Sequence, residues 1–295
     1  MMTPGASVTP RPTAPARHRL AALLSSLLAA LIGLGTTGGA KLAAAEDATR
    51  GFPLAPHEAR YELRLMSRAP GSTIVDARGD MHYRFVDTCD GWTMESRTTL
   101  DLYYSYGAPV HTEWSLVSWE SKEGDQYRFR VRSENNGTVD QIIDGRVRTN
   151  DDGRGGVVTF SKPDDSTLEL APDVLLPMRH TLAILQAAHD GQRIFTAPMF
   201  DGSDPEGPTL ATAVLTQAVP AGEISELPDH PLLKGPSWRL VLSFFAPDSA
   251  GSLPEYELQL RYHANGVAEE VIQDFGIMGL RASLKDLKAI EDGGC

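Results

Sequence analysis

The residues best suited to redox chemistry are the two cysteines of the chain, Cys89 and Cys295. No Cys-x-x-Cys pair is present, so the sequence does not predict a redox-active dithiol. In an oxidising compartment two lone cysteines usually pair. A bond between these two would close a loop of roughly 200 residues, which the chain-entropy model values at about 5 kcal/mol. Two free thiols or an intermolecular bridge are the alternatives.

Residues that could bind a metal ion are scattered or wrongly spaced. His180 and His189 are nine positions apart in a segment predicted to be helical, a rotation of about 900° that puts them on opposite faces. The acidic stretch 201–207 lacks the ligand spacing of a helix–loop–helix calcium site, so we expect a solvated turn there. The remaining histidines after the first 45 residues are expected at the surface or at strand edges: His57, His82, His111, His230 and His263. The sequence therefore predicts no metal site and no cofactor.

Motifs of common enzyme classes are missing from the sequence. There is no Gly-x-Ser-x-Gly elbow of a serine hydrolase. There is also no Gly-x-x-x-x-Gly-Lys-Ser/Thr loop and no Gly-x-Gly-x-x-Gly motif opening a helix, so nucleotide binding is not indicated. We predict no catalytic residues and expect that the protein is not an enzyme.

The first 45 residues are typical of an export signal. A basic, proline-dotted leader ends at Arg19, and an apolar run follows over residues 20–34. Fifteen helical residues span about 22 Å, less than the roughly 30 Å of a bilayer core. Small residues then lead to Ala45, as before a cleavage point. We expect a signal peptide over 1–45 and a mature periplasmic domain over 46–295 without a membrane span; an uncleaved anchor is the alternative.

The charge of the chain argues against nucleic-acid binding. The sequence has 27 basic and 39 acidic residues. Four of the basic residues and none of the acidic ones lie in the first 45 positions, which leaves 23 basic against 39 acidic residues, a net charge of −16. Nucleic-acid affinity comes mainly from neutralising phosphates, so such a chain is a poor candidate for it.

Alternating apolar and polar residues predict that the rest of the chain is one mainly β domain. Tyr61, Leu63 and Leu65 alternate with polar residues, and similar runs recur up to the C-terminal region. Clean alternation is typical of antiparallel strands with one buried face. We count about 13 strands. The pairs Asn136-Gly137 and Asn265-Gly266 predict tight hairpins, so each strand should pair with its neighbour in sequence.

One segment, residues 177–190, has the pattern of a helix instead. It begins with proline and is followed by Gly191, which is typical of a helix end. Met178, Leu182 and Leu185 lie on one helical stripe. We expect a helix that packs on the sheet or plugs one end of it, with a mobile lid as the alternative. The spacing of Leu280, Leu284 and Leu287 predicts a second, short helical turn near the end of the chain.

An ordered set of short strings resembles one known family. These strings are residues 77–81 (ARGDM), Cys89-Asp90-Gly91-Trp92, Trp119-Glu120-Ser121, Pro177 with His180, Phe200-Asp201-Gly202, residues 254–257 (PEYE), Asn265-Gly266-Val267 and the final Cys295. Together they resemble the EipB-type family of periplasmic cell-envelope integrity proteins from alphaproteobacteria. The resemblance extends over nearly all of residues 46–295.

The resemblance implies both a fold and a role. It implies a large antiparallel sheet wound into a spiral or open barrel around one central α-helix, with a disulfide between Cys89 and Cys295. The implied role is maintenance of envelope integrity under stress, without a known enzymatic activity. Because catalytic motifs are absent, we expect the protein to act through contacts with other periplasmic envelope proteins. The alternative is a carrier that holds a lipid, an acyl chain or a peptide inside the rolled sheet, gated by the helix at 177–190.

Overall fold

Strands dominate the computed structural model, which describes residues 52–246 and 253–291. This part of the chain contains fourteen strands, one α-helix and one short 3-10 helix. In chain order the elements are β1 (His57–Arg68), β2 (Ile74–Asp87), β3 (Gly91–Tyr104), β4 (Val110–Ser121), β5 (Gln126–Asn135), β6 (Thr138–Thr149), β7 (Gly156–Lys162), β8 (Ser166–Leu170), α3 (Pro177–His189), β9 (Ile194–Met199), β10 (Thr209–Val219), η1 (Pro231–Leu233), β11 (Ser237–Phe245), β12 (Tyr256–His263), β13 (Ala268–Asp274) and β14 (Met278–Ala289).

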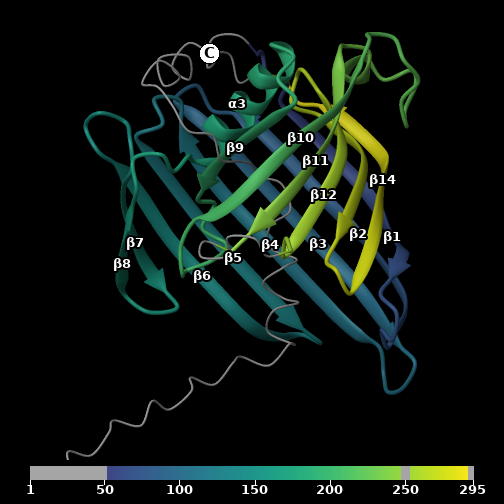
Figure 1. The fold of residues 1–295 in the computed structure, drawn as a ribbon. Helices are drawn as coiled ribbons and strands as arrows, with labels where there is room; N and C mark the ends of the chain where they lie inside the picture. The colour runs from purple at the N-terminus through teal and green to yellow at the C-terminus, as the bar shows by residue number, and fades with distance from the viewer. Residues whose placement is uncertain (1–51, 247–252, 292–295) are drawn as a thin grey trace, which may run out of the picture.

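All fourteen strands form one antiparallel sheet, which confirms the predicted fold class. The order across the sheet is β8-β7-β6-β5-β4-β3-β2-β1-β14-β13-β12-β11-β10-β9. Two meanders, β1–β8 and β9–β14, are therefore joined where β1 pairs with β14. The sheet curls without closing, because β8 and β9 are its two edges and do not pair with each other (Figure 1).

The predicted hairpins lie where the sequence indicated. Asn136 (φ 50°) and Gly137 (φ 76°) are both left-handed and connect β5 to β6. This is the conformation that an Asn-Gly turn adopts most easily. Gly266 (φ 83°) lies in the turn between β12 and β13. Short turns of this kind make each strand pair with its neighbour in sequence.

The core lies on the inner face of the curled sheet. Every second residue of β1 from His57 to Leu63 is buried, and the intervening Glu58, Arg60 and Glu62 are partly or fully exposed. The helix α3 lies at one end of the curl, at the top of Figure 1. The hydrophobic core joins residues of both meanders and of α3 in one cluster.

The helical turn predicted around Leu280, Leu284 and Leu287 is wrong. These residues belong to strand β14, and all three are buried. A β-bulge lets β14 skip one residue, Lys285, between the partners of Arg60 and Tyr61. The bulge changes the spacing of buried residues from two to three, and this mimicked a helical repeat.

Candidate functional site

The candidate site is the end of the curled sheet at which α3 lies. Of the three residues predicted to form the buried stripe, Leu182 (2% exposed) and Leu185 (0%) are in the core. Met178 is partly buried and packs against the core. Eight of the 13 helical residues are buried, among them His180, Ala187 and Ala188. This burial fits a plug better than a loosely attached lid.

A buried carboxylate from the sheet holds the N-terminus of α3. The N-cap residue Leu176 has no side chain that can accept a hydrogen bond. Glu120 of β4 takes this role: its Oε2 accepts from the backbone N–H of Met178 (2.7 Å) and its Oε1 from that of Arg179 (3.3 Å). Burial raises the pKa of Glu120 to about 7, although both helix hydrogen bonds favour the charged form.

Further contacts tie α3 to both meanders. The Arg179 guanidinium donates to the carbonyl of Glu123, in the turn after β4. In the second meander, the side chain of Tyr262 on β12 is hydrogen-bonded to that of Thr181. The helix therefore bridges β4 in the first meander and β12 in the second. His180 is fully buried, and desolvation holds its pKa well below its ordinary value, so its imidazole is neutral.

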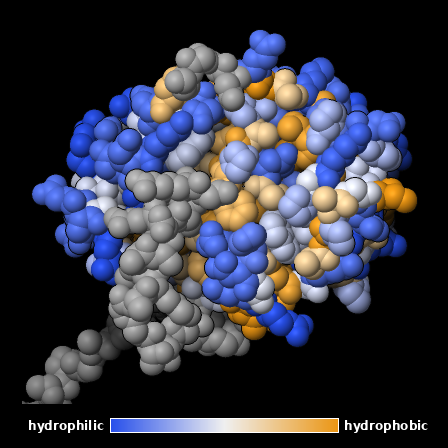
Figure 2. Space-filling model, turned by 90° about the horizontal axis from the view of Figure 1, so that it is seen from above, coloured by the Kyte–Doolittle hydropathy of each residue, from blue (hydrophilic) through white to orange (hydrophobic). Residues whose placement is uncertain are grey.

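A pocket lies beside the first turn of α3. Its walls come from both meanders and the helix: Leu54, Tyr83, Phe85, Trp92, Met94, Ser118, Glu120, Pro177, Met178, Thr181, Tyr262 and Gly266. Seen from this end, apolar side chains gather around the centre of the molecule (Figure 2). The free volume of the pocket is about 20 Å³. A single water needs about 10–15 Å³ by a comparable measure, whereas small-molecule sites enclose roughly 300–1,000 Å³.

The acidic stretch after β9 is only partly solvated: Asp204 and Glu206 are exposed as expected, whereas its first residues are packed. Asp201 and Gly202 are buried. Tyr127 donates to the backbone carbonyl of Asp201 (2.8 Å), and the Asp201 carboxylate accepts from the N–H and Oγ of Ser203. Gly202 lies against the Phe129 ring, where a Cβ would come within 2.2 Å of Cδ2. Burial raises the pKa of Asp201 to about 6, which makes it a second buried acid near neutrality.

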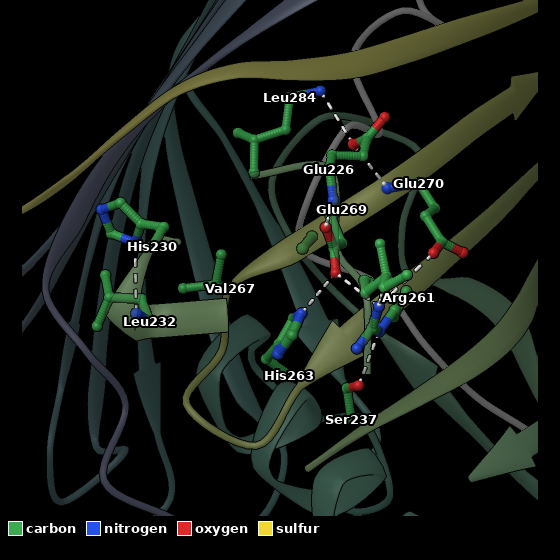
Figure 3. A network of polar contacts seen from close by, with 12 residues as sticks. Glu226, His230, Leu232, Ser237, Arg261, His263, Val267, Glu269, Glu270 and Leu284 are labelled. Atoms are coloured by element: carbon green, nitrogen blue, oxygen red, sulfur yellow. Dashed lines mark hydrogen bonds and ion pairs between the residues drawn. The ribbon is translucent and has the colours of Figure 1, made fainter. Parts of the chain in front are cut away.

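A buried charged network lies where β12 and β13 meet the connection between β10 and β11 (Figure 3). Arg261 and Glu269 are both 0% exposed, and Arg261 Nη1 lies 3.1 Å from Glu269 Oε1. The same oxygen is 2.9 Å from His263 Nε2. Arg261 also donates to Ser237 Oγ (2.9 Å) and to the carbonyl of Ile224 (2.6 Å).

Glu226 links this network to β14. Its Oε2 accepts from the backbone N–H of Glu270 on β13 (3.1 Å) and of Leu284 on β14 (3.0 Å). The direct pairing of these strands ends at Val271 and Ala282. The Glu226 carboxylate therefore replaces the backbone hydrogen bonds between β13 and β14 where these strands separate. The backbone N–H of Glu226 donates to Glu269 Oε2 (2.7 Å).

Sequence reasoning missed this network. His263 and His57 were both expected at the surface or at strand edges, yet both are buried. Charged residues that alternate with apolar ones look like a solvated strand face. The segment that covers these residues, around 224–226, comes from the connection between β10 and β11, and no local sequence pattern predicts this contact.

The described residues contain neither a metal-binding group nor a membrane-spanning helix. Among the described residues, no three His, Cys, Asp or Glu side chains are grouped so that they could hold a metal ion. No helix within 52–246 and 253–291 is both long enough and apolar enough to cross a lipid bilayer.

Of the two cysteines, only Cys89 lies within the described residues. Cys89 (φ 66°) lies in the turn between β2 and β3, where its N–H donates to Asp87. Cys295 and the expected signal peptide over 1–45 lie outside the described residues. The disulfide and the cleavage of the leader therefore stay predictions.

A family model and a related protein point to one family, and a solved structure supports the fold. A family model described as EipB-like matches residues 48–291. The cell envelope integrity protein EipB of Brucella abortus (strain 2308) is 27% identical over 262 residues, which cover 86% of this chain and 91% of that protein. A crystal structure of a beta-barrel-like protein of a domain of unknown function, also from Brucella abortus, has a TM-score of 0.76 at 22% identity. The match includes 100% of that structure's chain and 82% of this chain, and it supports the fold.

Proposed function

This chain belongs to the EipB-like family, and we propose that it is a periplasmic protein that maintains the integrity of the cell envelope without catalysing a reaction. The observation that carries the proposal is the similarity to a cell envelope integrity protein along 91% of that protein's length. The similarity therefore extends over nearly the whole of that protein and is not limited to a single site. The proposed mode of action is contact with other envelope proteins.

The buried polar groups form structural hydrogen bonds and ion pairs, which supports a scaffold rather than an enzyme. Glu120 holds the helix N-terminus, and Glu226 joins two strands. Arg261 and Glu269 lie at 0% exposure, where no substrate reaches them. Each of these groups already has a structural partner, whereas a catalytic group must reach a reacting atom.

A disulfide between Cys89 and Cys295 is part of the proposal. His57 pairs with Ala289 on one side and with Phe85 on the other, so these two residues are two strand spacings apart, about 10 Å. Cys89 follows Phe85 by four positions, and Cys295 follows Ala289 by six. Six extended residues span about 20 Å, so the two sulfurs are within reach of each other.

The carrier alternative finds less support. The pocket beside α3 has a free volume of about 20 Å³. A bound acyl chain would need the plug helix to move out and break the hydrogen bonds to Glu120. The carrier therefore requires a conformation in which α3 is released.

Deleting the gene tests the proposed role. The deletion strain should lose plating efficiency on deoxycholate and on a cell-wall-targeting β-lactam, and a plasmid copy should restore it. Growth on an antibiotic that acts in the cytoplasm serves as the control and should be unchanged. A deletion strain with wild-type tolerance of both envelope stresses would refute the proposal.

A further inference from the structure

Many outward-facing arginines of the sheet have a carboxylate within ion-pair distance: Arg60 with Asp80, Arg64 with Glu62, Arg78 with Asp76, Arg84 with Glu58 and Glu95, Arg130 with Asp144, and Arg132 with Glu134. Other exposed arginines have no such partner among the described residues, and three of these lie together on β5 and β6: Arg128, Arg146 and Arg148. We call these three the arginine cluster.

Two members of the arginine cluster face each other directly. Arg128 on β5 and Arg146 on β6 are paired in the strand register. Residues in such a position have Cβ atoms about 5 Å apart, and like charges there destabilise a sheet. Arg148 projects from the same face of β6, about 7 Å further along the strand. Three positive charges are thus held together on a protein whose residues after position 45 carry a net charge of −16.

The neighbours of the arginine cluster orient it without neutralising it. Arg128 lies over the ring of its other cross-strand partner, Trp119, at 5.4 Å from the ring centroid. Trp119 itself packs on Gly91, where a Cβ would come within 2.5 Å of the indole nitrogen. The Arg128 guanidinium is therefore stacked on a fixed aromatic surface.

The carboxylates around the arginine cluster are engaged or lie further away. The Asp125 carboxylate, in the turn before β5, feels the charge of Arg148 but accepts hydrogen bonds from Ser121 and Gln126. Asp144, two residues before Arg146, pairs with Arg130. Glu169 of β8 is separated from Arg148 by Val157 of β7. None of them lies within ion-pair distance of the three arginines.

We propose that Arg128, Arg146 and Arg148 form a binding site for a phosphoryl group carried by a compact ligand. A guanidinium fork donates two parallel hydrogen bonds to phosphate oxygens. A phosphoryl group offers three oxygens and up to two negative charges, which suits three neighbouring arginines better than a single carboxylate does. Binding the phosphoryl group also offsets the repulsion between Arg128 and Arg146.

The overall charge favours a small ligand over an extended polyanion. A strongly acidic protein is repelled by an anionic membrane or by a long polyanion. At physiological salt the screening length is about 8 Å, so a compact phosphoryl group experiences mainly the local positive charge of the arginine cluster.

Titration of the oxidised, mature protein with inorganic pyrophosphate tests the site. At constant ionic strength, the arginine Nε–Hε resonances followed by NMR should shift saturably for Arg128, Arg146 and Arg148. Arg146→Gln should weaken the apparent affinity at least fivefold and should not lower the melting temperature, because it removes one of two facing like charges. Arg84→Gln, which removes the same charge from a paired arginine, is the control and should leave the affinity unchanged.

Sedimentation with vesicles that contain phosphatidylglycerol separates the possible sources of the phosphoryl group. If the protein binds pyrophosphate saturably but does not sediment with the vesicles, the result supports a soluble ligand. Sedimentation that pyrophosphate abolishes supports a lipid headgroup held in the same site. Any of three results overturns the proposal. The first is that the arginine resonances show no saturable shift, and the second is that Arg84→Gln weakens the affinity as much as Arg146→Gln does. The third is that the protein binds vesicles to the same extent with and without pyrophosphate.

Discussion

Glu226 accepts a hydrogen bond from the backbone N–H of Leu284, 58 positions later in the chain, at 3.0 Å. The same carboxylate oxygen accepts from Glu270, so one side chain serves two strands at the point where their pairing ends. β14 is also the strand that joins the second meander to the first, through β1. The contact therefore stabilises the sheet close to the junction of its two halves.

Replacing Glu226 tests the importance of this contact. Glu226→Ala leaves two strand N–H groups without an acceptor and should lower the free energy of unfolding by about 2 kcal/mol, as expected for hydrogen bonds to a charged group. Glu226→Gln retains one carbonyl oxygen and should lose clearly less. Urea denaturation measures both variants. Equal losses in the two variants would mean that the hydrogen bonds to β13 and β14 contribute little.

Removing the proposed disulfide should destabilise the fold. Cys89→Ser and Cys295→Ser should each lower the melting temperature by a similar amount, because either change opens the same loop. The double variant should be no less stable than the single ones. The chain-entropy model gives about 5 kcal/mol as an upper value. A thiol reagent that titrates two sulfhydryls in the native wild-type protein would show that the bond is absent.

The buried Glu120 predicts a pH dependence of stability. Its pKa in the folded state is raised from 4.5 to about 7. The stabilising contribution of the protonated form is complete below about pH 4.5 and is lost as the pH rises through about 7. At 1.36 kcal/mol per pK unit the full change is about 3 kcal/mol.

Glu120→Gln is the variant that isolates this effect, because it is neutral at every pH. The stability of the wild type relative to Glu120→Gln should fall between pH 5 and pH 8, as followed by melting temperatures across this range. Glu123→Gln, in the neighbouring exposed turn, is the control and should follow the wild-type profile. A constant difference between the wild type and Glu120→Gln would mean that Glu120 does not titrate in this window.

The helix α3 should behave as a fixed plug. Leu185 is 0% exposed, and Leu185→Ala should cost about 3 kcal/mol, as is usual for a fully buried leucine. Gln186→Ala, on the partly exposed side of the same turn, should cost less than 1 kcal/mol. Hydrogen exchange gives a second measurement: the amides of α3 should be protected as strongly as those of β4. Exchange of α3 well ahead of the sheet would indicate a lid.

The sheet was predictable because its signals are local. Alternation such as that of Tyr61, Leu63 and Leu65 indicates the buried face of an antiparallel strand. A tight turn such as Asn136-Gly137 then pairs one strand with the next, here β5 with β6. Where a local irregularity interrupts the alternation, as at Lys285 in β14, the same reasoning gave a wrong helical turn.

The candidate site was only partly predictable from the sequence. The stripe of Met178, Leu182 and Leu185 identified α3 correctly as an amphipathic helix. That Glu120, 58 positions earlier than Met178, holds the N-terminus of this helix depends on how the sheet curls. The burial of Arg261 and Glu269 likewise depends on a covering segment that comes from the connection between β10 and β11.

If the protein maintains the envelope from the periplasmic side, as we propose, its export signal is required for this role. The most direct measurement is the plating efficiency of the deletion strain on deoxycholate when it carries either the full chain or the chain without residues 1–45, with both forms expressed at equal levels. Only the full chain, which carries the expected export signal, should restore growth. Equal restoration by the leaderless form would show that the protein does not act from the periplasm.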